Sequence, residues 1–189
     1  MRNYSTVSTD ERPYPGERSL SGSSAYLDGK RAGNPHATRR VEGGPMRAVV
    51  AKRVERGDAD LSEIRDLARA AGYEVVGELT QTREEDAAYA FGEGKVEELA
   101  ALARDVDADA VIVDNRLGPY QTFNIGGKLP EGAEVVDRFT LILDIFGQRA
   151  QTRKAQLQVE LAELRYELPR AEAKTSLAKR DERPGFMGL

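Results

Sequence analysis

Two glycine-rich runs that end in lysine could contact phosphate: FGEGK at 91–95 and GGK at 126–128. Glycines that open a helix expose backbone N–H groups, and these can hold a phosphate. A nucleotide-binding P-loop, however, has the pattern GxxxxGK followed by Ser or Thr, whose hydroxyl reaches magnesium. In both runs a branched aliphatic residue follows the lysine. We therefore interpret both runs as tight turns, with phosphate contact as the alternative.

Acidic residues offer a second kind of chemistry, because carboxylates bind metals and transfer protons. The candidates are Asp107, Asp109, Asp114 and Asp144. Asp114 follows an apolar run, at the carboxyl end of an expected strand, where α/β proteins bind their ligands. The alternative is that these carboxylates cap helices or lie at solvated loop ends. Cysteine is absent and His36 is the single histidine, which excludes thiolate sites and argues against histidine-based zinc sites and Ser-His-Asp triads. No metal site is predicted.

The charge balance limits binding to RNA to local patches. The formal net charge is −4, and the sequence pI is near 5.3, so the whole chain is no general polyanion binder. Cations gather in two groups, one near 150 and one beyond 169, and RNA contact is predicted there. The candidates are Arg149, Arg153, Lys154, Arg170, Lys174, Lys179, Arg180 and Arg183. For the second group the alternative is a solvated, flexible linker.

The apolar runs are too short for a signal peptide or for the roughly 20 residues that cross a bilayer. We therefore expect a cytoplasmic protein without membrane contact.

Residues 1–45 are rich in Ser, Gly, Pro, Arg and Tyr and have neither helical nor strand periodicity. Such a segment cannot bury enough apolar surface to fold, so we predict a disordered tail. The alternative is that translation begins at Met46, where the first strand pattern starts.

Strand and helix patterns alternate from Met46 onward, which predicts an α/β domain over 46–138. Its sheet is expected to be small and mostly parallel, with flanking helices. Strands are predicted at 47–54, 73–81, 109–115 and 133–138, and helices over 57–72, 95–106 and 117–127. The run DAVIVDN at 109–115 is almost continuously apolar, which is typical of a central strand covered on both faces.

A single long, projecting helix is predicted to follow. Its pattern spans about Asp137–Arg170, and residues 139–170 of it form a region separate from the α/β domain. Four leucines recur in helical rhythm, Leu157, Leu161, Leu164 and Leu168. Pro169 is expected to end the helix, and residues 171–189 are predicted to be a basic linker. The leucine stripe must pack on the α/β domain, on another copy of the chain, or on residues that this sequence lacks.

Several motifs follow one another along the chain: FGEGKVEELAAL at 91–102, DAVIVDN at 109–115, VVDRFTLILDIF at 135–146, and LILDIFGQRAQTR with LQVELAELRYELPR up to Arg170. In this order they resemble the HflX family of ribosome-associated GTPases. Together they cover about Met46–Arg170. The sequence departs from the family at Ala171, where an apolar residue is usual, and in lacking the glycine/arginine-rich loop over 171–189.

The resemblance implies that this chain is the N-terminal portion of a GTPase that binds the large ribosomal subunit and its RNA. GTP and Mg²⁺ would bind a following G domain, reached through a return helix, whereas this chain would hold no cofactor and be inactive alone. Its role would be in translation, ribosome recycling or biogenesis, with the basic group beyond 169 at the tip that reaches the ribosome. The alternative is a stand-alone α/β binding domain that self-associates through its leucine-striped helix.

Overall fold

The computed structural model describes residues 44–181, without the side chains of residues 178, 180 and 181. The predictions for the N-terminal tail, for His36 and for residues 182–189 therefore lie outside the described residues, apart from positions 44 and 45.

Four parallel strands form one sheet in the order β2-β1-β3-β4. Their bounds are β1 Met46–Val54, β2 Tyr73–Thr82, β3 Ala110–Val113 and β4 Glu134–Asp137. Every residue of β3 is buried, as its unbroken apolar run predicted. β1 and β3 are both central, which confirms the small parallel sheet.

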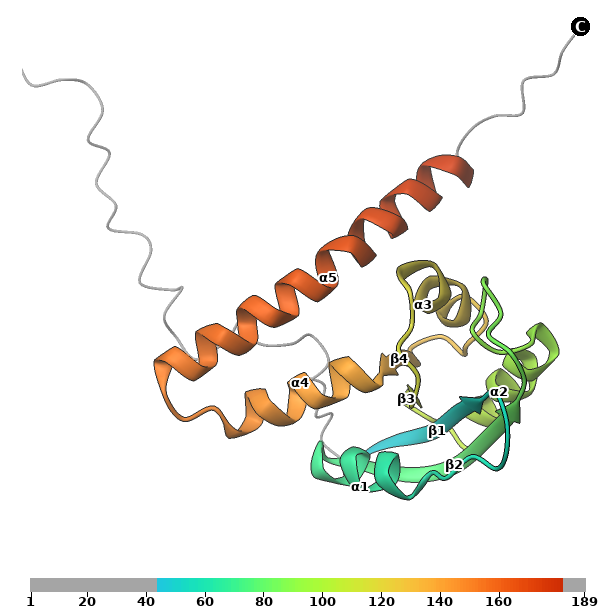
Figure 1. Ribbon diagram of the computed structural model, residues 1–189, viewed down its shortest axis with the longest axis horizontal. Coiled ribbons are helices and arrows are strands. Elements are labelled where there is room, and N and C mark those ends of the chain that lie inside the picture. Colours follow the sequence, from blue (N-terminus) through green and yellow to red (C-terminus); the bar gives the residue numbers. More distant parts are fainter. Residues whose placement is uncertain (1–43, 182–189) are drawn as a thin grey trace, which may run out of the picture. The chain divides into compact units, whose positions relative to one another are not determined.

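Helices connect the strands and cover both faces of the sheet (Figure 1). Their bounds are α1 Ser62–Ala70, α2 Glu93–Asp105, α3 Pro119–Gly126, α4 Arg138–Arg149 and α5 Arg153–Asp181. α1 and α4 pack against one face with residues such as Ile64 and Leu141. α2 and α3 cover the other face with residues such as Leu99 and Ile125.

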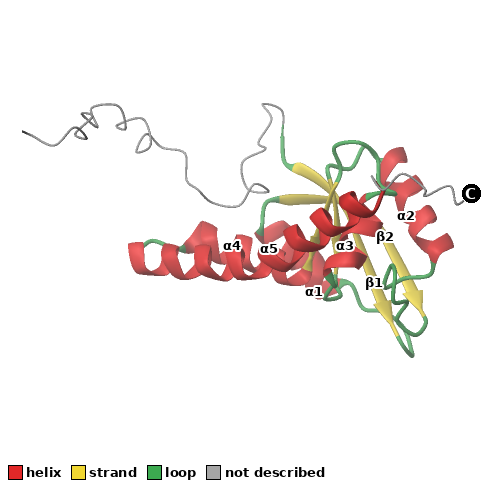
Figure 2. Cartoon of the chain, turned by 90° about the horizontal axis from the view of Figure 1, so that it is seen from above, coloured by secondary structure: helices red, strands yellow, loops and turns green. Residues whose placement is uncertain are grey.

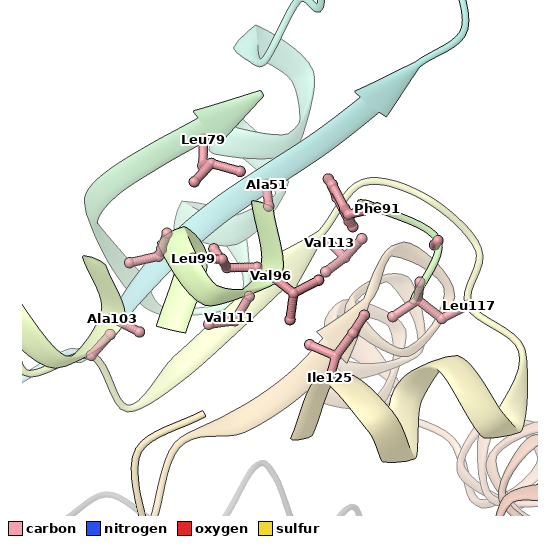
Figure 3. Packing of buried hydrophobic residues seen from close by; sticks show 13 residues of the cluster. Ala51, Leu79, Phe91, Val96, Leu99, Ala103, Val111, Val113, Leu117 and Ile125 are labelled. Carbon is pink, nitrogen blue, oxygen red and sulfur yellow. The ribbon is translucent and has the colours of Figure 1, made fainter. Parts of the chain in front are cut away.

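Alternate residues of the central strands serve the two cores, since successive side chains of a strand point to opposite faces. Val111 and Val113 meet α2 and α3 (Figure 3), whereas Ala110 and Ile112 meet α1 and α4. Phe91, two residues before the start of α2, is fully buried in the first core. The α/β layers are thus held by apolar packing on both sides.

Local sequence signals account for the ends of α1. The Asp60 carboxylate accepts hydrogen bonds from the backbone N–H and the hydroxyl of Ser62, at 2.8 and 2.9 Å. Both bonds lower the pKa of Asp60, and the bond from the backbone N–H has the larger effect. At the other end Gly72 has φ +94°, a backbone conformation that residues other than glycine rarely adopt.

A long helix is present as predicted, namely α5, but its predicted start at Asp137 was wrong: α4 is a separate helix, and the two lie side by side (Figure 2). The chain reverses direction across 150–152 (Figure 1). Thr152 caps the start of α5, since its hydroxyl accepts the N–H of Ala155 at 3.2 Å. α4 and α5 pack closely at Gly147, where a Cβ would lie 3.6 Å from Val159, an ordinary contact distance.

Pro169 does not end α5, which continues to Asp181. The predicted linker is therefore helical over 171–181. A proline inside a helix costs about 3 kcal/mol, so contacts on both sides of it must hold the helix together. Beyond Pro169, Arg170 bonds to the α/β domain and Ala173 is 6% exposed.

Two opposite faces of α5 are apolar. One face packs on α3 and α4 with residues such as Val159, Tyr166 and Ala173, which recur at helical spacing. The four leucines of the predicted stripe lie about 180° around the helix from Tyr166 and are 46 to 61% exposed. We call Leu157, Leu161, Leu164 and Leu168 the leucine face. It does not pack on the α/β domain, which removes one of its three predicted partners.

The contrast between core and leucine face gives a stability test. Ile112→Ala should lower the free energy of unfolding by about 2 to 5 kcal/mol, because it empties space in a fully buried site. Leu164→Ala, at 59% exposure, should change it by no more than about 0.5 kcal/mol. Urea unfolding of dilute protein measures both values. A loss for Leu164→Ala as large as that for Ile112→Ala would place the leucine face in the core.

Candidate functional site at the carboxyl edge of the sheet

Asp137, the last residue of β4, joins four parts of the chain at the carboxyl edge of the sheet. Its side chain is 3% exposed and caps α4 by accepting the N–H and hydroxyl of Thr140, both at 2.9 Å. It also accepts the Tyr166 hydroxyl and the Arg170 guanidinium at 3.0 Å, as well as the N–H of Leu117 at 3.4 Å. Asp137 therefore fixes α5 against the start of α4 and the loop before α3.

Tyr166 and Arg170 are one helical turn apart and form the α5 side of this contact. The Arg170 guanidinium lies 3.6 Å from the centre of the Tyr166 ring and donates to the carbonyl of Leu117 at 2.9 Å. Burial, together with the hydrogen bond to Asp137, raises the pKa of Tyr166 well above its usual range. Arg170, predicted to contact RNA, is thus engaged within the fold.

Asp114 directly follows β3, at the carboxyl ends of β1 and β3, where the strand order reverses and α/β proteins usually bind ligands. Here two cations neutralise its buried carboxylate: Lys52 at 2.7 Å and Arg138 at 2.5 Å. Arg138 also pairs with Glu63. The hydrogen bond to Glu63 raises the pKa of Arg138 most, and the bond to Asp114 raises it further. This arrangement is an ion-pair network that ties β1, β3 and α4 together.

The four predicted aspartates do not converge. Asp109 accepts the N–H of Arg47 at 2.7 Å, at the amino edge of the sheet, opposite Asp114. Asp144 is buried on α4, and Asp107, exposed, follows α2. Within residues 44–181, no three His, Cys, Asp or Glu side chains are grouped to hold a metal.

The run at 126–128 forms the turn that ends α3, whereas the run at 91–95 leads into α2, with Gly94 and Lys95 in the first turn of that helix. The N–H of Gly92 donates to Gln81 at 2.9 Å, and Lys95 pairs with Glu98 at 2.5 Å. Lys128 lies 3.5 Å from Glu93. The interpretation as a turn therefore holds for 126–128 but not for 91–95, and in both runs groups that could contact phosphate have partners within the fold.

The predicted RNA contacts fall into two exposed groups at opposite ends of α5. We call Arg149, Arg153 and Lys154 the turn cations, since they flank the reversal between α4 and α5. All three are exposed, and no acidic partner is found for them in the described part of the chain. Lys174 and Lys179 are exposed near the other end, whereas the side chains of Arg180 and Arg183 lie outside what the structure describes.

A groove of about 540 Å³ lies between α5 and the loop that leads into α3. The sequence did not predict this groove, because its walls come from three segments that are far apart in the chain. One wall did have a sequence signal: Tyr166 and Arg170 are four residues apart, on the side of the helix opposite the leucines. Its lining includes Glu85, Arg116, Leu117, Tyr120, Gln121, Arg165, Tyr166, Pro169 and Arg170.

No helix among the described residues is long and apolar enough to cross a membrane.

Comparison with known proteins defines the class. Residues 58–147 match the family described as GTP-binding GTPase N-terminal, and residues 149–189 match the family described as GTP-binding GTPase Middle Region. The boundary between the two matches falls at Gly147–Arg149, at the end of α4.

The chain belongs to the HflX family of GTPases and corresponds to the N-terminal part of its members. It is 45% identical over 150 residues to GTPase HflX of Thermofilum pendens, covering 78% of this chain and 35% of that protein. The chain is 41% identical over 145 residues to GTPase HflX of Thermococcus kodakarensis, covering 76% of this chain and 32% of that protein. The chain thus spans about a third of the length of these curated relatives.

Solved structures agree with this assignment. A GTP-binding protein from Sulfolobus solfataricus in complex with GDP has a TM-score of 0.54 and 26% identity, over 71% of this chain and 42% of that one. The G235S variant of SsGBP has a TM-score of 0.58 and 26% identity, over 69% of this chain and 41% of that one.

The Asp137 contact predicts how stability depends on pH. Tyr166→Phe should lower the free energy of unfolding by about 1.5 to 3 kcal/mol at neutral pH, the range for a hydrogen bond to a charged group. Because the pKa of Tyr166 is raised in the folded state, the unfolded state ionises first, from about pH 10. Stability from this residue is therefore present below pH ~10 and is lost as pH rises further.

Urea unfolding at about pH 8 and pH 10.5 tests both statements. Wild type should lose more stability on going to high pH than Tyr166→Phe does, and Tyr73, whose pKa burial also raises, should contribute to the loss in both. Tyr120→Phe, at an exposed tyrosine, is the control and should behave as wild type. Equal alkaline losses for wild type and Tyr166→Phe would contradict the assigned contact.

Proposed function

We propose that this chain is the ribosome-docking module of an HflX-type GTPase, which binds the RNA of the large ribosomal subunit in the cytoplasm. The observation that carries the proposal is the turn between α4 and α5. It presents the three turn cations at one end of a helical hairpin, inside the part of the chain that matches the GTPase family.

Charge around the turn suits a polyanion. No Asp or Glu occurs between Asp144 and Glu160, and the intervening residues are otherwise apolar or neutral polar. The turn cations are exposed and are not neutralised by the described side chains. An acidic chain can therefore still meet phosphate at this end of the hairpin.

GTP chemistry is assigned to another part of the full-length protein. The sequence contains no GxxxxGK[ST] run, whereas the relatives are named GTPases and are about three times longer than the matched region. We propose that GTP and Mg²⁺ bind a G domain, and that this chain orients that domain on the ribosome.

The leucine face supports a further element in the full-length protein. Removing one leucine from water is worth roughly 1.5 to 3 kcal/mol, so four exposed leucines in one row favour any apolar partner. We propose that a return helix of the same chain covers them. The rival proposal is a stand-alone domain that self-associates there. Reading the coding frame past Leu189 separates the two: a downstream GxxxxGK[ST] favours the first, a stop codon the second.

Replacing the turn cations tests docking. Arg149→Ala/Arg153→Ala/Lys154→Ala should weaken binding to purified large subunits and reduce the slope of log K against log salt by about one unit per lost phosphate contact. Co-sedimentation across a salt series measures both. Lys174→Ala/Lys179→Ala/Arg180→Ala/Arg183→Ala tests the other end of α5 in the same way.

Arg56→Ala/Arg104→Ala is the control, since both arginines are exposed on the α/β domain away from the hairpin. It should sediment as wild type does. If the turn variant and the control gave the same curve as wild type, the turn would not contact RNA.

Covering the leucine face tests association. The isolated chain should self-associate, and Leu161→Glu/Leu164→Glu should make it monomeric by placing two charges in the apolar row. Gln156→Glu/Gln158→Glu adds the same charge to exposed positions of α5 outside the leucine face and should leave association unchanged. Light scattering measures the mass. A wild-type chain that stays monomeric at high concentration with full helicity would contradict this prediction.

A further inference from the structure

The groove between α5 and the loop before α3 is separate from the turn cations, and its lining combines cations with aromatic rings. Arg116 comes from the loop that follows β3, Arg165 from α5, and Tyr120 from the first turn of α3. All three are exposed. They meet in one concave surface although nearly 50 residues separate the arginines in sequence.

The balance of charge in the groove is positive. Arg116 and Arg165 have no ion pair among the described residues. The acidic residue of the lining, Glu85, is already engaged by Gln121 at 2.9 Å and by Arg53 at 3.6 Å. Two guanidinium groups therefore remain available in a protein of net negative charge, and guanidinium binds phosphate by paired hydrogen bonds.

Tyr120 provides a ring that the fold does not use. It is 53% exposed, whereas Tyr166 in the same groove is held by Arg170 and by Phe139, whose ring centre lies 4.3 Å away. An exposed ring beside cations is the arrangement with which proteins stack unpaired bases while holding the adjacent phosphates. A paired base offers no free face to such a ring.

Hydrogen bonds hold the walls of the groove in place before any ligand binds. Gln121 accepts the N–H of Gly118 at 2.8 Å and donates to the carbonyl of Asp86 at 3.0 Å. From the other side, Arg170 holds the Leu117 carbonyl. Because the loop is fixed at both ends, binding does not have to order it.

We propose that this groove binds one unpaired nucleotide of RNA, with the base stacked on Tyr120 and the flanking phosphates held by Arg116 and Arg165. The choice of RNA as the source of that nucleotide rests on the proposed docking function. The groove thereby adds a contact that recognises single-stranded RNA to the sequence-independent contact at the turn cations.

Fluorescence anisotropy of the 189-residue chain with a labelled single-stranded RNA of about eight nucleotides tests the proposal. Tyr120→Ala should weaken binding about 5- to 150-fold, the usual effect of losing one base stack. Tyr120→Phe keeps the ring and should bind within about twofold of wild type. Arg116→Ala/Arg165→Ala should reduce the salt slope by about 1.4 units, at about 0.7 for each phosphate contact to a single strand.

Arg104→Ala, on α2 at the opposite edge of the sheet, is the matched control and should bind as wild type does. Circular dichroism confirms that each variant is folded. As a check that needs no variant, RNA containing 4-thiouridine should crosslink on irradiation to the wild-type peptide that contains Tyr120. Crosslinks confined to other peptides would overturn the proposal.

Three further results would overturn it. They are equal binding of the single strand and its duplex, equal weakening by Tyr120→Phe and Tyr120→Ala, and competition by free AMP at the same concentration as the oligonucleotide. Co-sedimentation separates the two proposals. If wild type binds large subunits but not the single strand, only the proposal of nucleotide binding in the groove is wrong. If it binds the single strand but not the subunits, only the proposal of ribosome docking is wrong.

Discussion

The buried carboxylate of Asp137 is the interaction on which the arrangement of the helices depends. It caps α4 through Thr140 and accepts Tyr166 and Arg170 of α5. Without these bonds, α5 would lose its polar attachment to the sheet, and the groove would lose one wall. A charge this deeply buried is stable only when its partners are all in place, so the same residue that stabilises the fold also fixes the orientation of the hairpin.

That orientation explains why α5 can continue through a proline. The attachment of Arg170 to Leu117 and Asp137, together with the burial of Ala173, stabilises helix on the far side of Pro169 and offsets its cost of about 3 kcal/mol. It also turns the leucine face outward. The α/β domain therefore serves as the base of the hairpin, which presents separate surfaces: cations at its turn and an apolar row along α5.

The sequence predicted the sheet better than the hairpin. The apolar run of β3 and the glycine stop at Gly72 are local signals, and each was followed by the structure. The reversal at 150–152 was missed because it contains neither Gly nor Pro, and only the cap by Thr152 marks it. The contacts of Arg170 with Leu117 and Asp137 and the groove were not foreseen, because both depend on residues that only the folded chain brings together.

Hydroxyl-radical footprinting of the side chains, with the chain free and bound to large ribosomal subunits, is the sharpest test of docking through the turn. We expect protection of residues 149–157 around the turn and of Tyr120 in the groove, with α1 and α2 as reactive as in the free chain. Protection confined to α1 or α2, or no protection of the turn in the bound complex, would contradict it.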